Sequence, residues 1–305
     1  MSVAIEVPAA LAGERLDRVV ATVTGVSRSV AASLIDSGAV ELDGRVERSA
    51  KVRVVEGASL TVEVPDEQPH RVIPDTTIAI DVVHEDADVL VVDKPAGVVV
   101  HPGAGNSSGT LVHGLVARFP EIATVGDPAR PGIVHRLDKG TSGLLVVARS
   151  PAAYVSLVEQ MSSHEVERRY DALAWGQVEP STGVIDAPIG RSSRDPTKMT
   201  VSTKGRAART HYRVEKVYRR PALVSLLECR LETGRTHQVR VHLAAIHHPV
   251  VGDARYGGAR EPLRVARPLL HARALAFVHP STGERIEVEA PLPSDFRAVL
   301  ESLSE

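Results

Sequence analysis

The sequence predicts an α+β protein with a small N-terminal domain and a larger second domain. Residues 1–64 contain two helical patterns followed by short strand patterns, and residues 65–74 are rich in proline and charge. The remaining residues mix strand-like apolar runs with a few well-marked helices. With 305 residues, the chain is long enough for two modest domains that each bury a core.

The composition is that of an ordinary protein of an aqueous compartment. Hydrophobic residues make up 43% and charged residues 24%, and the net charge of -2 does not by itself indicate nucleic acid or membrane. The single Cys229 excludes an internal disulfide, and its strand-like surroundings favour a core thiol over a nucleophile. No signal pattern and no apolar run of about 18 residues is present, so we expect a cytoplasmic protein.

The N-terminal elements follow from apolar spacing. Apolar residues at helical intervals start at Leu16 and again at Val30, so two helices are expected. Asp43-Gly44 between short apolar runs predicts a hairpin, and residues 59–64 form a further strand pattern. This arrangement suits a small module with a basic face, or a plain accessory domain in which acids offset the arginines.

The second domain contains several marked elements. Ser150 caps a helix that begins at Pro151, and residues 111–119 form another helix. Pro280-Ser281-Thr282-Gly283 indicates a hairpin between two strand patterns. The other strand patterns cover residues 88–93, 144–148 and 223–231.

Three polar clusters are candidates for chemistry. Asp138 stands between the cations Arg136 and Lys139, just before the core strand 144–148. Such an acid is either held rigidly for function or solvated in a loop. Tyr170 follows two arginines, and Arg235 offers a planar cation that can pair with Asp138. Together these clusters predict an acid-centred site.

Residues 191–220 are the most basic part of the chain. Ten cations face only two acids there, which is typical of a surface that binds a polyanion, although a solvated hairpin is the alternative. Aromatic residues are only 3% of the chain, which favours one base held in a pocket over a stacking platform. The cations are Arg191, Arg194, Lys198, Lys204, Arg206, Arg209, Arg213, Lys216, Arg219 and Arg220.

Neither a metal nor a cofactor is expected. The glycine-rich residues 101–110 lack the spacing of a phosphate-binding loop. His237, His242, His247 and His248 lack the cysteine pair or the HExxH spacing that would indicate zinc.

Three motifs follow one another along the chain: His135-Arg136-Leu137-Asp138 with Thr141-Ser142-Gly143, Arg169-Tyr170-x-Ala172-Leu173, and Gly234-Arg235-Thr236-His237-Gln238 with Arg240-Val241-His242-Leu243. In this order they resemble the RluA/RluD-type family of RNA pseudouridine synthases, and the resemblance covers residues 75–292. In the N-terminal part, Arg15-Leu16-Asp17 with Leu34-Ile35 and Asp43-Gly44 resembles the RNA-binding domain named after ribosomal protein S-four.

The resemblance implies a fold, a reaction and roles for residues. The fold is a catalytic domain on a large mixed, mostly antiparallel sheet flanked by helices and loops. Asp138 is the nucleophile, which attacks a flipped-out uridine at C1′ or C6, and no cofactor is needed. Arg136 fills the space the base leaves, Tyr170 packs on the base, and Arg235 pairs with Asp138. His135, Thr141, Lys204, Arg206 and Arg209 are the further substrate-binding candidates.

We therefore expect a cytoplasmic, monomeric isomerase that converts uridines to pseudouridine in RNA, with large-subunit ribosomal RNA or an assembling particle as the substrate. The expected domains are residues 13–65, a linker at 66–75, and a catalytic domain at 76–305. The alternatives are a transfer RNA substrate, a non-catalytic RNA-binding assembly factor, and a glycosidase-like hydrolase. The last lacks the usual second catalytic acid in these motifs.

Overall fold

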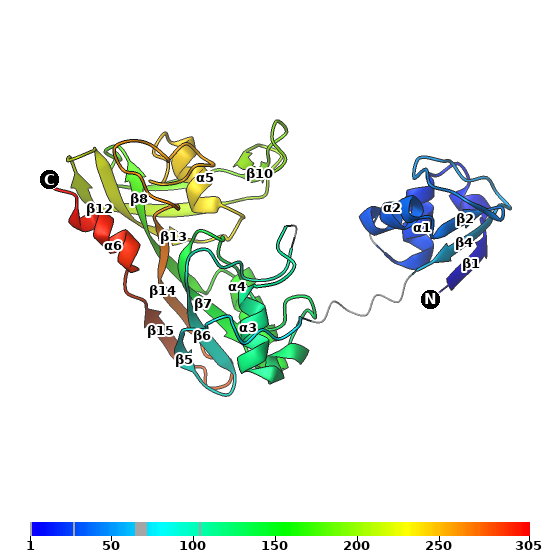
Figure 1. Cartoon of the computed structure of the whole chain (residues 1–305), viewed down its shortest axis with the longest axis horizontal. Helices are drawn as coiled ribbons and strands as arrows, with labels where there is room; N and C mark the ends of the chain where they lie inside the picture. Colours follow the sequence, from blue (N-terminus) through cyan, green and yellow to red (C-terminus); the bar gives the residue numbers. More distant parts are fainter. Residues whose placement is uncertain (1, 27, 65–71, 104) are drawn as a thin grey trace. The chain divides into compact units, whose positions relative to one another are not determined.

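The computed structural model describes residues 2–26, 28–64, 72–103 and 105–305. The chain divides into two compact units, Met1–His70 and Arg71–Glu305 (Figure 1). Of the expected linker at 66–75, residues 66–71 lie outside the described residues. Within the described residues, no helix is both long and apolar enough to cross a membrane.

The N-terminal unit packs two helices on a four-stranded sheet with the order β1-β4-β2-β3. Asp43 and Gly44 both have positive φ, which is the turn geometry the Asp-Gly pair predicts. The expected start at residue 13 leaves out β1, which pairs along its whole length with β4. The elements are β1 (Ser2–Glu6), η1 (Ala9–Leu11), α1 (Leu16–Thr24), α2 (Arg28–Ser37), β2 (Val40–Leu42), β3 (Arg45–Val46) and β4 (Ser59–Glu63).

The second unit is built on a nine-stranded sheet with the order β5-β6-β7-β14-β8-β13-β12-β9, where β15 also pairs with β14. β14 runs parallel to β7, and the other strand pairs of this sheet are antiparallel within the described residues. The predicted α+β class with a mixed, mostly antiparallel sheet is confirmed. The strands are β5 (Val82–Glu85), β6 (Val89–Lys94), β7 (Ser142–Ala148), β8 (Glu167–Trp175), β9 (Thr182–Asp186), β12 (Arg209–Tyr218), β13 (Val224–Leu231), β14 (Leu270–Val278) and β15 (Arg285–Glu289).

The central strand β7 is buried on both faces, because its side chains alternate between two cores. Leu145 and Val147 pack with helix α3, whereas Leu144 and Val146 pack with helix α4. The predicted cap of α4 is present, since Ser150 Oγ accepts a hydrogen bond from the Ala153 amide at 3.1 Å. The helices are α3 (Leu111–Arg118), η2 (Pro120–Thr124), α4 (Pro151–Ser162), α5 (Gln238–Ala245) and α6 (Ser294–Glu301).

A separate two-stranded hairpin, β10 (Ile189–Arg191) with β11 (Met199–Val201), extends from the second unit near α5 (Figure 1). Lys198 and Lys204 flank its second strand. We call this segment, residues 189–206, the basic hairpin.

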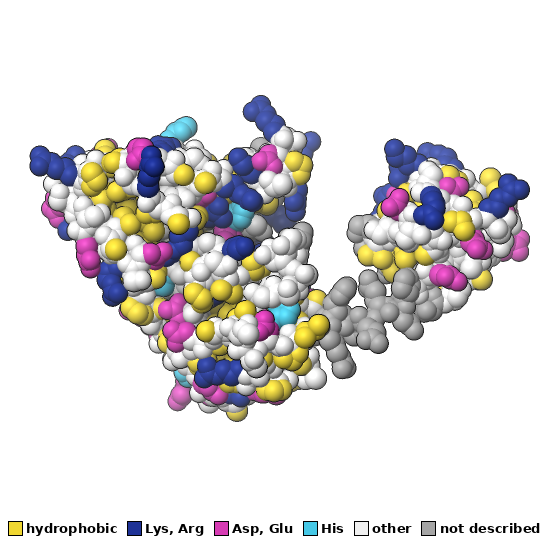
Figure 2. Space-filling view, in the orientation of Figure 1, with side chains coloured by type: hydrophobic (Ala, Val, Ile, Leu, Met, Phe, Trp, Pro, Cys, Tyr) yellow, Lys and Arg dark blue, Asp and Glu magenta, His cyan; other side chains and the backbone are white. Residues whose placement is uncertain are grey.

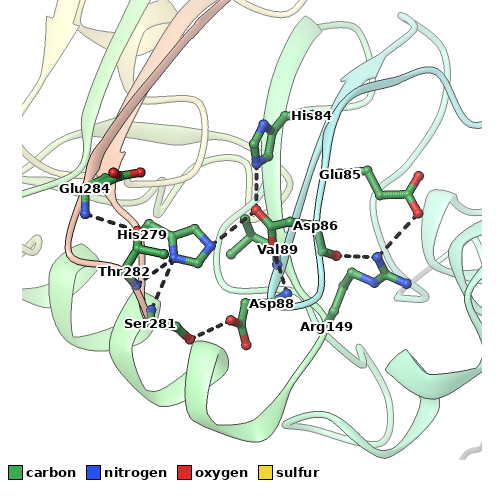
Figure 3. Close-up of polar contacts among 10 residues, drawn as sticks. All are labelled: His84, Glu85, Asp86, Asp88, Val89, Arg149, His279, Ser281, Thr282 and Glu284. Carbon is green, nitrogen blue, oxygen red and sulfur yellow. Dashed lines mark hydrogen bonds and ion pairs between the residues drawn. The ribbon is translucent and has the colours of Figure 1, made fainter.

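Asp86 joins the β5–β6 turn to the end of β14 (Figure 3). His84 Nε2 donates a hydrogen bond to its Oδ2 at 2.7 Å, and His279 Nε2 donates to the same oxygen at 3.2 Å. The amides of Asp88 and Val89 donate to Oδ1, both at 2.8 Å. Burial opposes the negative charge, but these hydrogen bonds outweigh it and lower the pKa of Asp86 to about 2.

Replacing Asp86 by asparagine should lower the free energy of unfolding of this unit by about 1–3 kcal/mol at pH 7, because an amide cannot accept from both imidazoles and both backbone amides as the carboxylate does. A carboxyl whose pKa falls on folding stabilises the protein above its unfolded value of 3.8, and this contribution is lost as the pH falls toward 2. The deficit of the variant should therefore shrink in acid.

Urea unfolding followed by the fluorescence of Trp175, the only tryptophan of the chain, measures this effect in the second unit. Glu85→Gln is the matched control, because Glu85 is the exposed neighbour of Asp86 and has one ion pair, with Arg149 at 3.3 Å. Equal losses of stability in the two variants would contradict the prediction.

Candidate active site

Asp138 lies in the wall of a cavity of about 590 Å³ in the second unit. The loop that precedes β7 supplies Asp138, Arg136 and Thr141, β8 supplies Tyr170, and the segment before α5 supplies Arg235. The structure therefore brings together the three polar clusters that the sequence singles out. Their shared wall combines cations, one carboxylate and one phenol, with apolar side chains between them.

The loop holds Asp138 at the mouth of β7. The Asp138 carbonyl accepts a hydrogen bond from the Thr141 amide at 3.1 Å, which closes a turn directly before the strand. Gly143 has φ +113 and lies against the backbone of Ala272 in β14, where an added Cβ would come within 2.3 Å of the Ala272 carbonyl oxygen. A glycine is therefore required at this close strand contact, which lies five residues from Asp138.

The cation paired with Asp138 is Arg240. Its Nη1 donates a hydrogen bond to Asp138 Oδ2 at 3.0 Å, while Nε and Nη2 donate to the buried Asp253 at 2.6 and 2.9 Å. Burial opposes the charge of Arg240, but its bonds to Asp253 and Asp138 outweigh this and raise its pKa above the usual value. The guanidinium is thus a fixed countercharge for Asp138.

Arg235 does not make the predicted pair with Asp138. Its Nε donates to the Ala207 carbonyl at 2.9 Å, and its side chain is partly exposed at the cavity wall. The physical reason is position: Arg235 precedes α5, whereas Arg240 lies inside the first turns of α5, on the buried side that faces Asp138. The predicted pairing is therefore corrected to Arg240.

Tyr170 is 6% exposed and lines the cavity from β8. Burial, opposed by Arg168 and reinforced by Asp138, raises its pKa to about 12, so its phenol keeps its proton at neutral pH. Arg168, two residues before it, is also buried in the cavity wall, and its Nη2 donates to the Glu232 carbonyl at 3.2 Å. Burial lowers the pKa of Arg168, while Tyr170 opposes this shift.

The remaining candidates of the loop differ in their freedom to bind a ligand. His135 Nε2 accepts a hydrogen bond from the Val146 amide at 3.0 Å, and burial and then Arg168 lower its pKa to about 3, so its ring is neutral. Arg136 is exposed at the cavity wall. Arg136 is thus the cation of this loop that is best placed to meet a ligand entering the cavity.

The basic residues of 191–220 lie outside the set that lines the cavity, and part of their charge is neutralised. Lys204 and Arg206 are exposed, and Figure 2 shows Lys and Arg side chains gathered over the basic hairpin. Nearby acids offset several of the remaining cations. The ion pairs are Arg209 with Asp186 and Glu232, Arg213 with Glu215 and Glu228, and Lys216 with Glu305.

Sequence reasoning missed three groups around Asp138. Arg240 and Asp253 form the buried pair described above. The sequence signal that could have found this pair was Arg240 itself, the second arginine of the motif at residues 234–243, which falls on α5. Lys94 is fully buried, and its Nζ donates to the carbonyls of Pro95 and Val98 at 2.8 and 2.9 Å. Burial lowers the pKa of Lys94 to about 7, although Asp138 opposes this shift. No local pattern marked Lys94 as buried, because it stands at the polar end of its strand.

Comparison with known proteins identifies the family of the chain. The family model for RNA pseudouridylate synthase matches residues 88–245, and the model for the S4 domain matches residues 14–60. A ribosomal large subunit pseudouridine synthase D from Xanthomonas campestris is 45% identical, covering 98% of this chain and 92% of that protein. An uncharacterised RNA pseudouridine synthase from Bacillus subtilis is 42% identical, covering 95% of this chain and 94% of that protein.

Among solved structures, human RNA pseudouridylate synthase domain containing 1 matches with a TM-score of 0.60 and 32% identity, covering 76% of this chain and 90% of that chain. The family predicted from the three motifs is thereby confirmed. The chain therefore belongs to the RNA pseudouridine synthase family, enzymes that isomerise uridine in RNA to pseudouridine, and it carries an S4 domain at its N-terminal end.

Proposed function

We propose that this enzyme modifies uridines of large-subunit ribosomal RNA, in the cytoplasm and as a monomer. The observation that supports the substrate is similarity over nearly the full chain to proteins named for the large ribosomal subunit. These include the Xanthomonas relative and one from Pseudomonas aeruginosa, which is 43% identical over 98% of this chain. In this proposal, residues 13–65 bind RNA and residues 76–305 carry out the reaction.

In the proposed reaction, a carboxylate oxygen of Asp138 forms a bond to C1′ or to C6 of the target uridine. On the C1′ route the bond between N1 and C1′ breaks as the new bond forms, and on the C6 route it breaks after the addition. The detached uracil then turns within the cavity, and its C5 joins C1′. The carboxylate is released, C5 loses its proton to solvent and N1 takes up a proton, so the product is an isomer of the substrate and nothing is oxidised. Arg240 supports the role of Asp138, because its hydrogen bond to Oδ2 orients the carboxylate in the cavity wall.

The cavity wall suggests how the base is held. Tyr170 keeps its phenolic proton at neutral pH, which supports packing of its ring on the uracil rather than direct acceptance of the C5 proton. Arg136 occupies the space in the RNA that the flipped uridine leaves, which its exposed position at the cavity wall supports. Thr141 and His135 line the cavity from this loop, and in this proposal Arg235, which also lines the wall, meets the RNA backbone.

Tritium release tests the substrate. Transcripts of large-subunit ribosomal RNA and of transfer RNAs, each with tritium at uridine C5, are incubated with the full chain, and the modified positions are then mapped by carbodiimide-dependent stops of reverse transcription. We expect release from ribosomal RNA at a few defined positions. Release from transfer RNA alone would overturn the ribosomal assignment, and a dimer in sedimentation at assay concentration would overturn the monomer.

The salt dependence of RNA binding tests the basic hairpin. Changing both Lys204 and Arg206 to alanine should reduce the slope of log K against log salt by about 0.7 for each phosphate contact that is lost. Arg209→Ala is the matched control, because Asp186 and Glu232 already neutralise Arg209, and its slope should stay near that of the wild type. An unchanged slope in the double variant would show that the hairpin does not contact the RNA.

A further inference from the structure

Asp138 has a second neighbour besides Arg240. The Nε2 atom of His237 lies 4.0 Å from Asp138 Oδ1, which is the oxygen that Arg240 does not hold. His237 has left-handed backbone angles, with φ 59 and ψ 23, at the residue that precedes α5. Left-handed residues other than glycine are uncommon, and they persist where surrounding contacts fix them. The contact that holds His237 in this conformation therefore bears on its role beside Asp138.

Tyr256 makes that contact. Its hydroxyl lies 2.7 Å from His237 Nδ1 and also accepts a hydrogen bond from the Met199 amide at 3.1 Å. A phenol has one proton, and no other side-chain hydrogen bond of this hydroxyl occurs within the described residues. When the phenol donates this proton to Nδ1, the proton of the neutral His237 ring sits on Nε2, the atom that lies 4.0 Å from Asp138 Oδ1.

The ring of Tyr256 also supports Arg240. The Arg240 guanidinium carbon lies 5.1 Å from the centre of the Tyr256 ring, and the ring meets the His237 imidazole edge-on at 5.6 Å. One tyrosine thus contacts both of the groups that flank the Asp138 carboxylate.

We propose that His237 and Tyr256 are a positioning pair for Asp138, in which Tyr256 fixes the ring of His237 so that its Nε2–H is offered to Asp138 Oδ1. Together with Arg240 on the other oxygen, this sets the orientation in which the carboxylate meets the uridine. The distance of 4.0 Å closes to a hydrogen bond when substrate binds, since catalytic contacts are often long in the free enzyme. This inference rests on the proposed role of Asp138.

The electrostatic surroundings agree with a neutral His237. Burial lowers its pKa, Asp138 and Asp253 oppose that shift, and Arg240 and Arg255 reinforce it. A neutral imidazole can donate from Nε2 without neutralising the Asp138 carboxylate, so the carboxylate keeps its negative charge for the attack.

Tyr256→Phe tests the pair, because it removes the hydroxyl and keeps the ring beneath Arg240. At saturating tritiated ribosomal RNA, the single-turnover rate should fall about tenfold, while the Kd for RNA and the urea midpoint stay unchanged. Tyr218→Phe is the matched control, a buried tyrosine of the same unit outside the cavity, and it should react at the wild-type rate. A Tyr256→Phe rate equal to the wild type would overturn the proposal.

A double-mutant cycle separates positioning from general support of the fold. His237→Asn keeps a residue that tolerates left-handed angles but cannot reproduce the imidazole donor. If Tyr256 acts through His237, adding Tyr256→Phe to His237→Asn should slow the reaction by less than twofold. A full additional tenfold loss would overturn the pair. Asp138→Asn is run beside these variants: activity in that variant would defeat the nucleophile assignment itself, whereas an inactive Asp138→Asn with a fast Tyr256→Phe would defeat only the positioning pair.

Discussion

Replacing Asp138 by asparagine should reduce the single-turnover rate of tritium release by at least about 10⁴-fold, because loss of a covalent nucleophile leaves only binding and electrostatic contributions. The amide oxygen can still accept the hydrogen bond from Arg240, so the packing of the cavity is preserved while the negative charge is lost. The affinity for RNA should stay within about threefold, since binding relies on distributed contacts to phosphates.

The measurement is tritium release under single-turnover conditions, with Kd from filter binding and stability from Trp175 fluorescence. Asp81→Asn is the control, because Asp81 is exposed on the same unit and does not line the cavity. An Asp138→Asn enzyme that retains a tenth of the wild-type rate would show that another group forms the bond to the uridine.

Replacing Arg240 by lysine should have the second largest effect. Lysine keeps the charge but cannot hold Asp253 through two nitrogens and Asp138 through a third, as the guanidinium does. We expect the rate to fall about 10²-fold, since a misplaced catalytic group costs about this much, and the free energy of unfolding to fall by about 3 kcal/mol because a buried carboxylate loses its partner.

Arg235→Lys is the informative comparison, because the motif alone assigns the pairing with Asp138 to Arg235. Its side chain bonds to the Ala207 carbonyl at the cavity wall, so the rate at saturating RNA should change by less than about threefold and the stability by less than about 0.5 kcal/mol. If Arg235→Lys lost more rate and stability than Arg240→Lys, Arg235 would again be assigned as the partner of the Asp138 carboxylate.

Local signals predicted the elements of this protein well where a few neighbouring residues decide the structure. The Ser150 cap and the buried run of β7 depend on contacts between residues close in sequence or on a strongly apolar pattern, and both are present. The position of Asp138 at the mouth of β7 followed from the same run. The strand β1 escaped prediction because its partner β4 lies more than fifty residues away and its own pattern is short.

The partners of charged groups could not be predicted in the same way. Counting charges within residues 191–220 overlooked Asp186, Glu232 and Glu305, which reach the segment from other elements. Which of Arg235 and Arg240 pairs with Asp138 depends on where α5 begins. Arg235 precedes the helix and lies at the cavity wall, whereas Arg240 lies about one helical turn further along and is buried. Side-chain pairing across the fold is thus the information that a single sequence withholds.

The parallel pairing of β14 with β7 has a consequence for the synthesis of the enzyme. Ser142, at the start of β7, meets His271 of β14 across 129 positions of the chain, and Arg240 needs Asp253 to hold it. During translation, Asp138 therefore leaves the ribosome long before the residues that fix it in place. Non-local pairings form only once both partners are available. A nascent chain that lacks β14 therefore contains Asp138 without the strand contacts that fix it in place. We therefore expect the Asp138 carboxylate to be held in place only after β14 has been synthesised.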